Sequence, residues 1–418
     1  MAYKRTTKTS ATIGREVDAA YVVESSIRFE ANRVRVTSAL IHASDQVQLW
    51  SASYDSEPSS MLAFQRELGT TIAEQIRLRL SPERLESLTR RQTRNPQAYD
   101  LYLRGRHFWN QLTPATTRQA VEAFSRATEL DPDYALAWSG LADAYAASPM
   151  NGDAPPLAAW KLAREAAAQA VRAEPRLAES HSSLGFVHFW FDWTWPDAEV
   201  AFRKSIALDP SYAFAHRMLG VLLGHAGRHP EAEAEMKRAR ELDPLNAMHH
   251  ALSAQVAFVG RDNAAAVEFA RQAIVVDPRF WIGHFQLSQA YEQLGEAALA
   301  LAATDEAGRL SGGNSKAISL RGYILAKQGK PTEARDVLKT LAARSRDRFV
   351  PPYALALVHE GLGEHDAALD LLERAVEIRD VHLVSLPVDP KWDALRASPR
   401  FGELLRRCGL PVITAPLR

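Results

Sequence analysis

Two pairs of histidines in this chain come closest to the spacing of metal ligands. His181 and His188 lie two helical turns apart, and His249 is adjacent to His250. Zinc sites combine such residues with cysteines, with carboxylates or with an H-E-x-x-H motif, and neither pair has these nearby in the sequence. Histidines at the surface or between helices are therefore the favoured interpretation, and we expect no metal site and no cofactor.

Residues for covalent or phosphate chemistry are equally isolated. Cys408 is the one cysteine, which excludes an internal disulfide, and no histidine lies near it in the sequence to activate the thiol. Gly312 and Gly313 lack the Lys-Ser/Thr end of a phosphate-binding loop, and no G-x-S-x-G, kinase or cyclase signature occurs. We expect no catalytic residue and predict that the chain is not an enzyme.

The composition excludes further classes of protein. The 418 residues are 46% hydrophobic, enough for a continuous core, and 50 basic residues balance 50 acidic ones. A net charge of zero argues against a general nucleic-acid surface. The first residues lack the apolar core of a signal peptide, and no run has transmembrane length. We therefore predict a cytoplasmic protein that contacts neither membrane nor nucleic acid.

A period of 34 residues organises the elements that carry these side chains. Pro210, Pro244 and Pro278 each follow an aspartate, at intervals of 34 residues (244 − 210, 278 − 244). A small residue keeps the same interval at Ala198, Ala232, Ala266, Ala300, Ala334 and Ala368. A fixed period of this length indicates stacked helix–turn–helix units, each of which buries its apolar faces only against its neighbours.

The segment from Ser211 to Pro244 resembles the tetratricopeptide repeat. Gly220 places a small residue where the first helix crosses the second, and the second helix carries Ala232 and Met236 on one face. About eight such units fit into residues 95–379 at this period. The resemblance implies a mainly α fold, a tetratricopeptide-repeat superhelical solenoid, with a C-terminal capping segment at residues 380–418.

Residues 1–92 do not follow the period. The segments VVESSIRFE, RVRVTSALI and QVQLWSASYD alternate apolar and polar residues, which predicts three strands. Apolar residues at helical spacing then predict an amphipathic helix between Met61 and Leu80. Together these elements predict a small α/β domain in front of the solenoid.

A second resemblance is carried by several phrases of the chain. AYVVESSIRFEANRVRVTSALIHASDQVQLWSASYD resembles the second half of the TolB amino-terminal-like domain of bacterial regulators, which precedes tetratricopeptide arrays. NPQAYDLYLRGRHFW, FDWTWPDAEVAFRKSIALDP and VDPKWDALRASPRFGELLRRCGLP resemble the same family. Its members often begin with a winged-helix DNA-binding domain, a class III nucleotide cyclase or a protein kinase. The resemblance implies that 1–92 is a partial domain without an effector in front, whose exposed sheet edge offers a site for homo-oligomer formation.

The densest aromatic run has two interpretations. Trp190, Phe191, Trp193 and Trp195 lie in a turn that is one residue longer than the 34-residue period requires. Such a run can form a cage for a cationic ligand. Packing of the lengthened turn is the simpler explanation, and we favour it.

The concave face of the solenoid is the remaining candidate site. The tetratricopeptide resemblance implies that positions two, five, nine and twelve of each first helix line a partner-binding groove. These positions include Phe186, Phe189, Phe214, Arg217, Val221, Met248, Gln255, Phe258, Ile282, Phe285, Gln289 and Tyr323. The lysines and asparagines with which chaperone-binding members clamp a peptide carboxylate are absent. An apolar and aromatic face predicts a protein partner with an amphipathic helix or an extended apolar segment. The alternative, that half of these residues only contact the next helix, stays open.

Two functions follow from these observations. The first is a non-enzymatic interaction scaffold of a bacterial signalling or transcription-regulation family, which binds a partner segment in the concave groove. The second is the sensory or oligomerising half of a transcriptional regulator or class III nucleotide cyclase whose effector is not in this chain.

Overall fold

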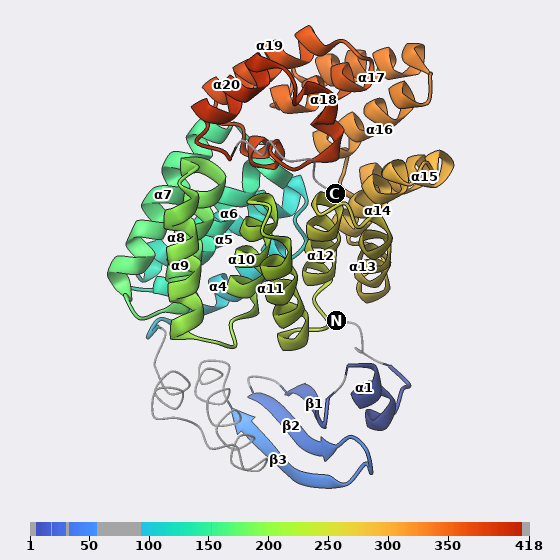
Figure 1. The fold of residues 1–418 in the computed structure, drawn as a ribbon. Coiled ribbons are helices and arrows are strands. Elements are labelled where there is room, and N and C mark those ends of the chain that lie inside the picture. Colours follow the sequence, from blue (N-terminus) through green and yellow to red (C-terminus); the bar gives the residue numbers. More distant parts are fainter. Residues whose placement is uncertain (1–5, 18, 31–32, 57–92, 152, 412–418) are drawn as a thin grey trace. The chain divides into compact units, whose positions relative to one another are not determined.

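The computed structural model describes residues 6–17, 19–30, 33–56, 93–151 and 153–411 (Figure 1). The chain divides into two compact units, with the boundary between Pro96 and Gln97.

The first unit contains a helix and an antiparallel sheet. Helix α1 (Ser10–Glu16) precedes β1 (Tyr21–Glu30), β2 (Arg33–His42) and β3 (Gln48–Ser56), and the strand order is β1-β2-β3. The three predicted strands are confirmed. Val36 and Leu40, four residues apart on one face of β2, are buried, as the period of two predicts. The predicted helix at 61–80 lies outside the described residues.

The second unit is an array of paired helices, which confirms the predicted solenoid. Each pair contributes a first helix to the inner layer and a second helix to the outer layer (Figure 1). The pairs are α4 (Pro96–Trp109) with α5 (Pro114–Leu130), α6 (Ala135–Asn151) with α7 (Pro156–Ala173), α8 (Ala178–Val187) with α9 (Trp195–Leu208), α10 (Ala213–His225) with α11 (His229–Leu242), α12 (Ala247–Val259) with α13 (Asn263–Val276), α14 (Trp281–Gln293) with α15 (Ala297–Leu310), α16 (Ser315–Lys327) with α17 (Pro331–Arg344), and α18 (Pro352–Gly361) with α19 (His365–Glu377).

Small residues set the distance between neighbouring helices. The alanines of the 34-residue series, from Ala198 to Ala368, are fully buried in the second helices. Glycines allow the closest approach: a Cβ atom on Gly140 would lie 2.6 Å from the ring of Phe124, and one on Gly185 would lie 2.8 Å from the ring of Phe202. The apolar ring of one helix thus fills the space that the other leaves open.

The Asp-Pro corners have a recurring hydrogen-bond pattern. Asp209 and Asp277 end their helices with extended backbone angles, and their carboxylates accept hydrogen bonds from the backbone N–H two residues later. The ring N–H of a residue six positions after the proline donates to the proline carbonyl in five units. These donors are Trp138, His181, His216, His250 and His284. The corner satisfies backbone groups at the start of each first helix.

Two departures from the 34-residue period have structural explanations. The extra residue near Trp193 is absorbed by a π-helical turn, His188–Asp192, after which Trp193 takes a left-handed φ of 58°. The lengthened loop after α6 reaches the junction of α15 and α16. There Asn314 Nδ2 donates to the carbonyl of Asn151 at 3.0 Å, and the backbone N–H of Ser315 donates to the Asp153 carboxylate.

These contacts close the array on itself. Trp281 Nε1, at the start of α14, donates to the carbonyl of Leu112, which follows α4, at 3.0 Å. Figure 1 shows the red C-terminal part of the chain next to the teal helix α6, which the start of α16 also contacts. The first helices therefore surround an enclosed interior.

The segment after α19 enters this interior. It forms two 3₁₀ turns, η3 (Val381–Ser385) and η4 (Pro390–Leu395), and then helix α20 (Pro399–Arg407), which packs against α19. We call residues 380–395 the C-terminal segment. Val381, Leu383, Val384, Val388 and Trp392 of this segment are fully buried.

Candidate functional site

A cavity of about 130 Å³ remains inside the array. Its wall includes most of the residues predicted for the groove, namely Phe186, Phe214, Arg217, Met248, Gln255, Ile282, Phe285 and Gln289. They come from four successive first helices, α8, α10, α12 and α14. The wall is completed by residues of the C-terminal segment, among them His382, Asp389 and Lys391.

The other four predicted groove residues are buried and do not line the cavity. Phe189 packs against Trp190 and Trp195, with ring centroids 4.8 and 5.4 Å apart. Val221 and Tyr323 are buried within the helix layer. Phe258 is covered by the C-terminal segment, because Lys391 Nζ lies 4.6 Å from its ring centroid and Val388 belongs to the same apolar cluster.

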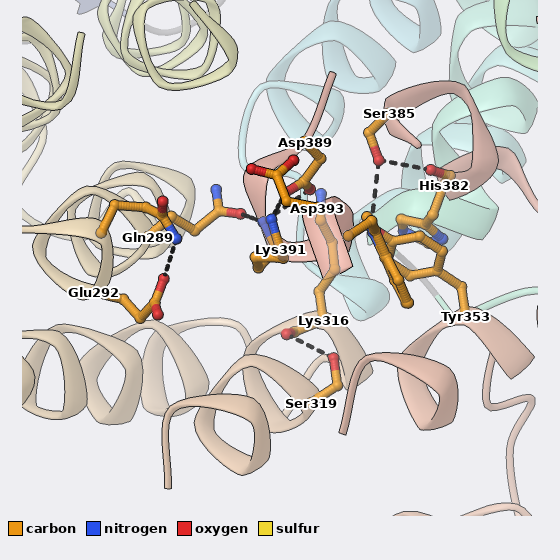
Figure 2. A network of polar contacts seen from close by, with 12 residues as sticks. Gln289, Glu292, Lys316, Ser319, Tyr353, His382, Ser385, Asp389, Lys391 and Asp393 are labelled. Atoms are coloured by element: carbon orange, nitrogen blue, oxygen red, sulfur yellow. Dashed lines mark hydrogen bonds and ion pairs between the residues drawn. The ribbon is translucent and has the colours of Figure 1, made fainter. Parts of the chain in front are cut away.

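Lys391 is the main polar anchor of the C-terminal segment. Its ammonium forms an ion pair with Asp389 at 2.8 Å and donates to Gln289 Oε1 at 2.6 Å (Figure 2). The side chains of Lys391 and Asp389 are almost fully buried, at 3% and 7% exposure. A buried ion pair contributes to stability only when the remaining hydrogen-bonding groups of both ions are satisfied. Here the amide of Gln289 and the ring of Phe258 provide further contacts for the Lys391 ammonium.

A second set of polar contacts holds the other half of the segment. Asp380 accepts hydrogen bonds from the backbone N–H of His382 and of Tyr353, and forms a 2.7 Å contact with His382 Nδ1. Trp392 Nε1 donates to the Tyr353 hydroxyl at 3.0 Å, and Ser385 lies 3.3 Å from the same hydroxyl. Arg261 of the loop after α12 pairs with Asp393 at 2.8 Å.

Two cations of the cavity wall have no carboxylate partner. Arg217 is 4% exposed, its Nε has no hydrogen-bond partner, and its guanidinium carbon lies 4.6 Å from the Phe214 ring centroid. Lys316 Nζ lies 5.1 Å from the Phe285 ring centroid. Within the described part of the chain neither side chain forms an ion pair. Burial lowers the pKa of Arg217 to about 10 and, together with the nearby Lys391, lowers the pKa of Lys316 to about 8.

The aromatic run packs around a cation of the same chain. The Arg379 guanidinium lies 5.0 Å from the Trp193 ring and 4.9 Å from the Trp160 ring, and it donates to the carbonyl of Phe191 at 2.7 Å. This arrangement agrees with the favoured interpretation, in which the aromatic run packs the lengthened turn. Arg379 occupies the position that an external cation would take in a cage.

The candidate metal and nucleophile residues have structural partners. His181 and His250 bind the proline carbonyls of their corners, and His188 contacts Asp192 at 2.9 Å. No group of three metal-binding side chains occurs among the described residues. Cys408 is buried in the apolar cluster, and burial raises the pKa of its thiol to about 12, which leaves it protonated. No described helix has the length and apolar character needed to cross a membrane.

The sequence analysis did not predict a role for Asp389, Lys391 or Lys316, three charged residues of the cavity wall. The phrase VDPKWD carries Asp389 and Lys391, and its Asp-Pro corner repeats the corners of the array, which was the available signal for an ordered structure. Lys316 follows a polar stretch that interrupts the proline series, and no pattern in the sequence distinguishes it from a surface lysine.

Comparison with known proteins supports the repeat assignment. The family model described as "Tetratricopeptide repeat" matches residues 195–247 and 319–381. A solved structure of the hetero-tetramer Cut9-Hcn1 of the APC/C has a TM-score of 0.50 and 15% identity, over 74% of this chain and 55% of that one. A tetratricopeptide repeat protein from Parabacteroides merdae has a TM-score of 0.42 and 16% identity, over 65% of this chain and 100% of that one. The likeness to the Cut9-Hcn1 structure concerns the fold alone.

One curated relative is similar in sequence. It is the "Putative adenylate cyclase 3" of Rhizobium meliloti (strain 1021), 32% identical over 140 residues. The match covers 34% of this chain and 24% of that protein, so this chain spans about a quarter of the relative's length. The period, the paired helices and the family model lead to one conclusion about the second unit: it is a tetratricopeptide-repeat solenoid.

Proposed function

We propose that the chain is a non-enzymatic protein–protein interaction scaffold whose concave face binds an extended segment of a partner protein. One observation carries this proposal: the concave face already holds a segment, residues 380–395 of the same chain, through Gln289, Phe258 and Arg261. A face that binds one segment in this way has the contacts needed to bind another of the same chemistry.

The contacts define the partner segment. Gln289 accepts from an ammonium group, Phe258 takes the same cation above its ring, and Tyr353 accepts from an indole N–H. A partner that replaces the C-terminal segment therefore presents a lysine and a tryptophan, with an apolar residue in the place of Val388. The same segment of a second copy of this chain has this chemistry too.

The cellular context we propose is bacterial signalling or transcription regulation. The support is the resemblance to TolB-like regulators and the similarity to a protein named as an adenylate cyclase. The alternative proposal is a sensory or oligomerising half of such a regulator. The two proposals differ in whether a partner or a fused effector receives the signal, and the genomic sequence upstream of Met1 distinguishes them.

A peptide titration tests the groove directly. The probe is a fluorescent synthetic peptide of residues 379–397, titrated into the full chain and into its Lys391→Ala variant. Because the variant holds its own segment less tightly, we expect the peptide to bind it at least about tenfold more tightly than the wild type. A peptide that itself carries Lys391→Ala is the matched control, and we expect it to lose this binding.

The second part of the test concerns natural partners. Partner capture from the source organism is compared between the wild type, Phe214→Ala and Phe285→Ala, with the exposed Val275→Ala as the surface control. Loss of capture in the first two variants alone is the expected result. Equal capture by all four proteins, together with no peptide binding to the Lys391→Ala chain, would refute a binding function of the concave face.

A further inference from the structure

The cavity has a positive charge that the C-terminal segment does not neutralise. Asp389 is the one carboxylate among its lining residues, and it is already paired with Lys391 at 2.8 Å. Arg217 and Lys316 add two cations from α10 and α16. A buried cation without a counter-ion costs several kcal/mol in a protein interior, so a stable structure usually supplies an anion.

The carboxylates around the cavity do not supply it. Asp243 and Asp143 are the carboxyl groups that influence Arg217. The side chain of Asp243 is 48% exposed, whereas burial raises the pKa of Asp143 to about 7, and Ser183 donates to Asp143 at 2.8 Å. It therefore carries only part of a charge at neutral pH. Lys316 is influenced by the ammonium of Lys391 and by no carboxylate, and Figure 2 shows its side chain extending toward Lys391.

The rest of the wall combines apolar surface with hydrogen-bond donors. Phe186, Phe214, Met248 and Phe285 provide flat apolar contacts. Trp109 and Trp190 also line the cavity, and their buried indole N–H groups have no hydrogen-bond partner among the described residues. His225 is neutral at physiological pH, because burial lowers its pKa to about 4.

The size of the cavity limits its ligand. The cavity, of about 130 Å³, is close in volume to the roughly 150 Å³ cavity that accommodates a benzene molecule in another protein, and its open side leaves room for a carboxylate group on such a ring. A peptide or nucleotide does not fit, whereas a small organic acid does.

We propose that this cavity is a binding site for a small organic acid, whose carboxylate groups are held by Lys316 beside Phe285 and by Arg217 beside Phe214, and whose carbon skeleton packs against these two rings. The site goes beyond the proposed scaffold function, because its ligand is a metabolite-sized anion rather than a protein segment. Neither Lys316 nor the buried indoles are part of the segment-binding contacts.

The test uses benzoate as a probe with one carboxylate, glutarate as a probe with two, and benzamide as the neutral analogue of benzoate. Binding to the full-length chain is measured by isothermal titration calorimetry and by the fluorescence of the cavity tryptophans. We expect at least one of the two acids to bind, and benzamide to bind at least about tenfold more weakly than benzoate where benzoate is the ligand. Preference for glutarate over benzoate means that both cations hold a carboxylate.

Two variants separate a binding role from a structural one. Lys316→Met and Arg217→Met remove a charge and keep apolar volume, and Lys339→Met, on the exposed face of α17, is the control. We expect the two cavity variants to bind the acid at least about tenfold more weakly. Their melting temperatures without ligand stay equal to that of the wild type or rise, because an unpaired buried charge has been removed. A residue that only stabilises the fold would lower the melting temperature.

Two results would overturn the site. One is the absence of binding of both acids up to roughly 10 mM, a concentration that detects even the weakest useful affinity. The other is acid binding of equal strength by the wild type and both cavity variants, which would place the ligand elsewhere on the chain.

Discussion

At the scale of single residues, the array depends on glycines that face aromatic rings. A Cβ atom on Gly140 would lie 2.6 Å from the ring of Phe124, which is fully buried and also lies against Gly105. The ring therefore has no free direction in which to move. An alanine at such a position forces a shift of the helices themselves.

The first prediction tests this packing. Gly140→Ala lowers the free energy of unfolding by roughly 1–3 kcal/mol, because overpacking outweighs the gain in helix propensity. Gly308→Ala in α15 is the matched control, since nothing lies within 4 Å of its Cβ position, and it raises stability by roughly 0.5–1 kcal/mol. Urea unfolding followed by circular dichroism measures both. Equal effects of the two substitutions would contradict the packing argument.

A buried carboxyl group makes stability depend on pH. Burial raises the pKa of Asp143 to about 7, whereas an unfolded aspartate titrates near 3.9. Between these values the unfolded chain has released its proton and the folded chain has kept it. The contribution of Asp143 to stability therefore falls as the pH rises from about 4 to about 7, and is constant above.

The second prediction isolates this contribution. Asp143→Asn keeps an oxygen that accepts from Ser183 and removes the titration. The variant is more stable than the wild type by roughly 1–3 kcal/mol at pH 8, and the difference shrinks toward pH 4. His225 and His249, whose pKa values burial lowers to about 4 and about 2, are present in both proteins, so their opposite pH dependence cancels. A difference that is constant from pH 4 to pH 8 would contradict this assignment.

At the scale of elements, the C-terminal segment carries a buried ion pair between Asp389 and Lys391, and the Lys391 ammonium also binds Gln289 of α14. Removing one partner of such a pair leaves the other charge buried and alone, which costs more than the pair contributes. Asp389 also caps η4, because its Oδ1 accepts from the backbone N–H of Lys391.

The third prediction tests the cost of leaving one charge of this buried pair unpaired. Lys391→Met lowers stability by roughly 3–5 kcal/mol, and amide hydrogens of residues 380–395 exchange faster. The double variant Asp389→Asn/Lys391→Met recovers most of this loss, because no unpaired charge remains and asparagine keeps the cap. The exposed Lys339→Met changes stability by less than about 0.5 kcal/mol. A double variant as unstable as Lys391→Met would rule out the unpaired carboxylate as the cause.

At the scale of the whole second unit, distant pairs are linked by side chains. Asn314 is fully buried, caps α16 through its Oδ1, and donates its Nδ2 to the carbonyl of Asn151. Open repeat arrays unfold gradually from their ends, because each unit contacts only its neighbours. A closed array loses this independence.

The fourth prediction concerns cooperativity. Asn314→Asp keeps the capping oxygen and replaces the donor with a charge that faces the Asn151 carbonyl, so we expect a loss of roughly 2–4 kcal/mol. In the wild type, α4–α7 and α16–α19 unfold in one transition, and in the variant they separate. Hydrogen exchange at increasing denaturant concentrations measures this. Asn246→Asp is the control, because Asn246 is also a cap and its Nδ2 bonds the nearby Asp243; separated transitions in that variant would contradict the argument.

The parts of this architecture that follow the 34-residue period were predictable, because they depend on neighbours in the sequence. The buried alanines, the Asp-Pro corners and the first-helix positions of the groove belong to this class. The recurring histidine six residues after the proline has a visible period too, although its hydrogen bond to the carbonyl was not foreseen. The sequence analysis considered two of these histidines, His181 and His250, as candidate metal ligands.

The rest depends on the curvature of the superhelix. Lys391 meets Gln289 across 102 residues, and Asn314 meets Asn151 across 163. Each unit is rotated slightly relative to the one before it, and these rotations accumulate along the superhelix. Whether two distant units meet depends on the accumulated rotation, which no short sequence pattern predicts. The unpaired state of Lys316 is equally invisible in the sequence, since it follows from what surrounds the side chain in three dimensions.

The closure of the array has a consequence for how such a gene can change. Open solenoids grow and shrink by duplication or deletion of whole units, because any unit can follow any other. Here one unit more or less would move Asn314 away from Asn151 and Trp281 away from Leu112. The closure of the array therefore ties this fold to one number of units.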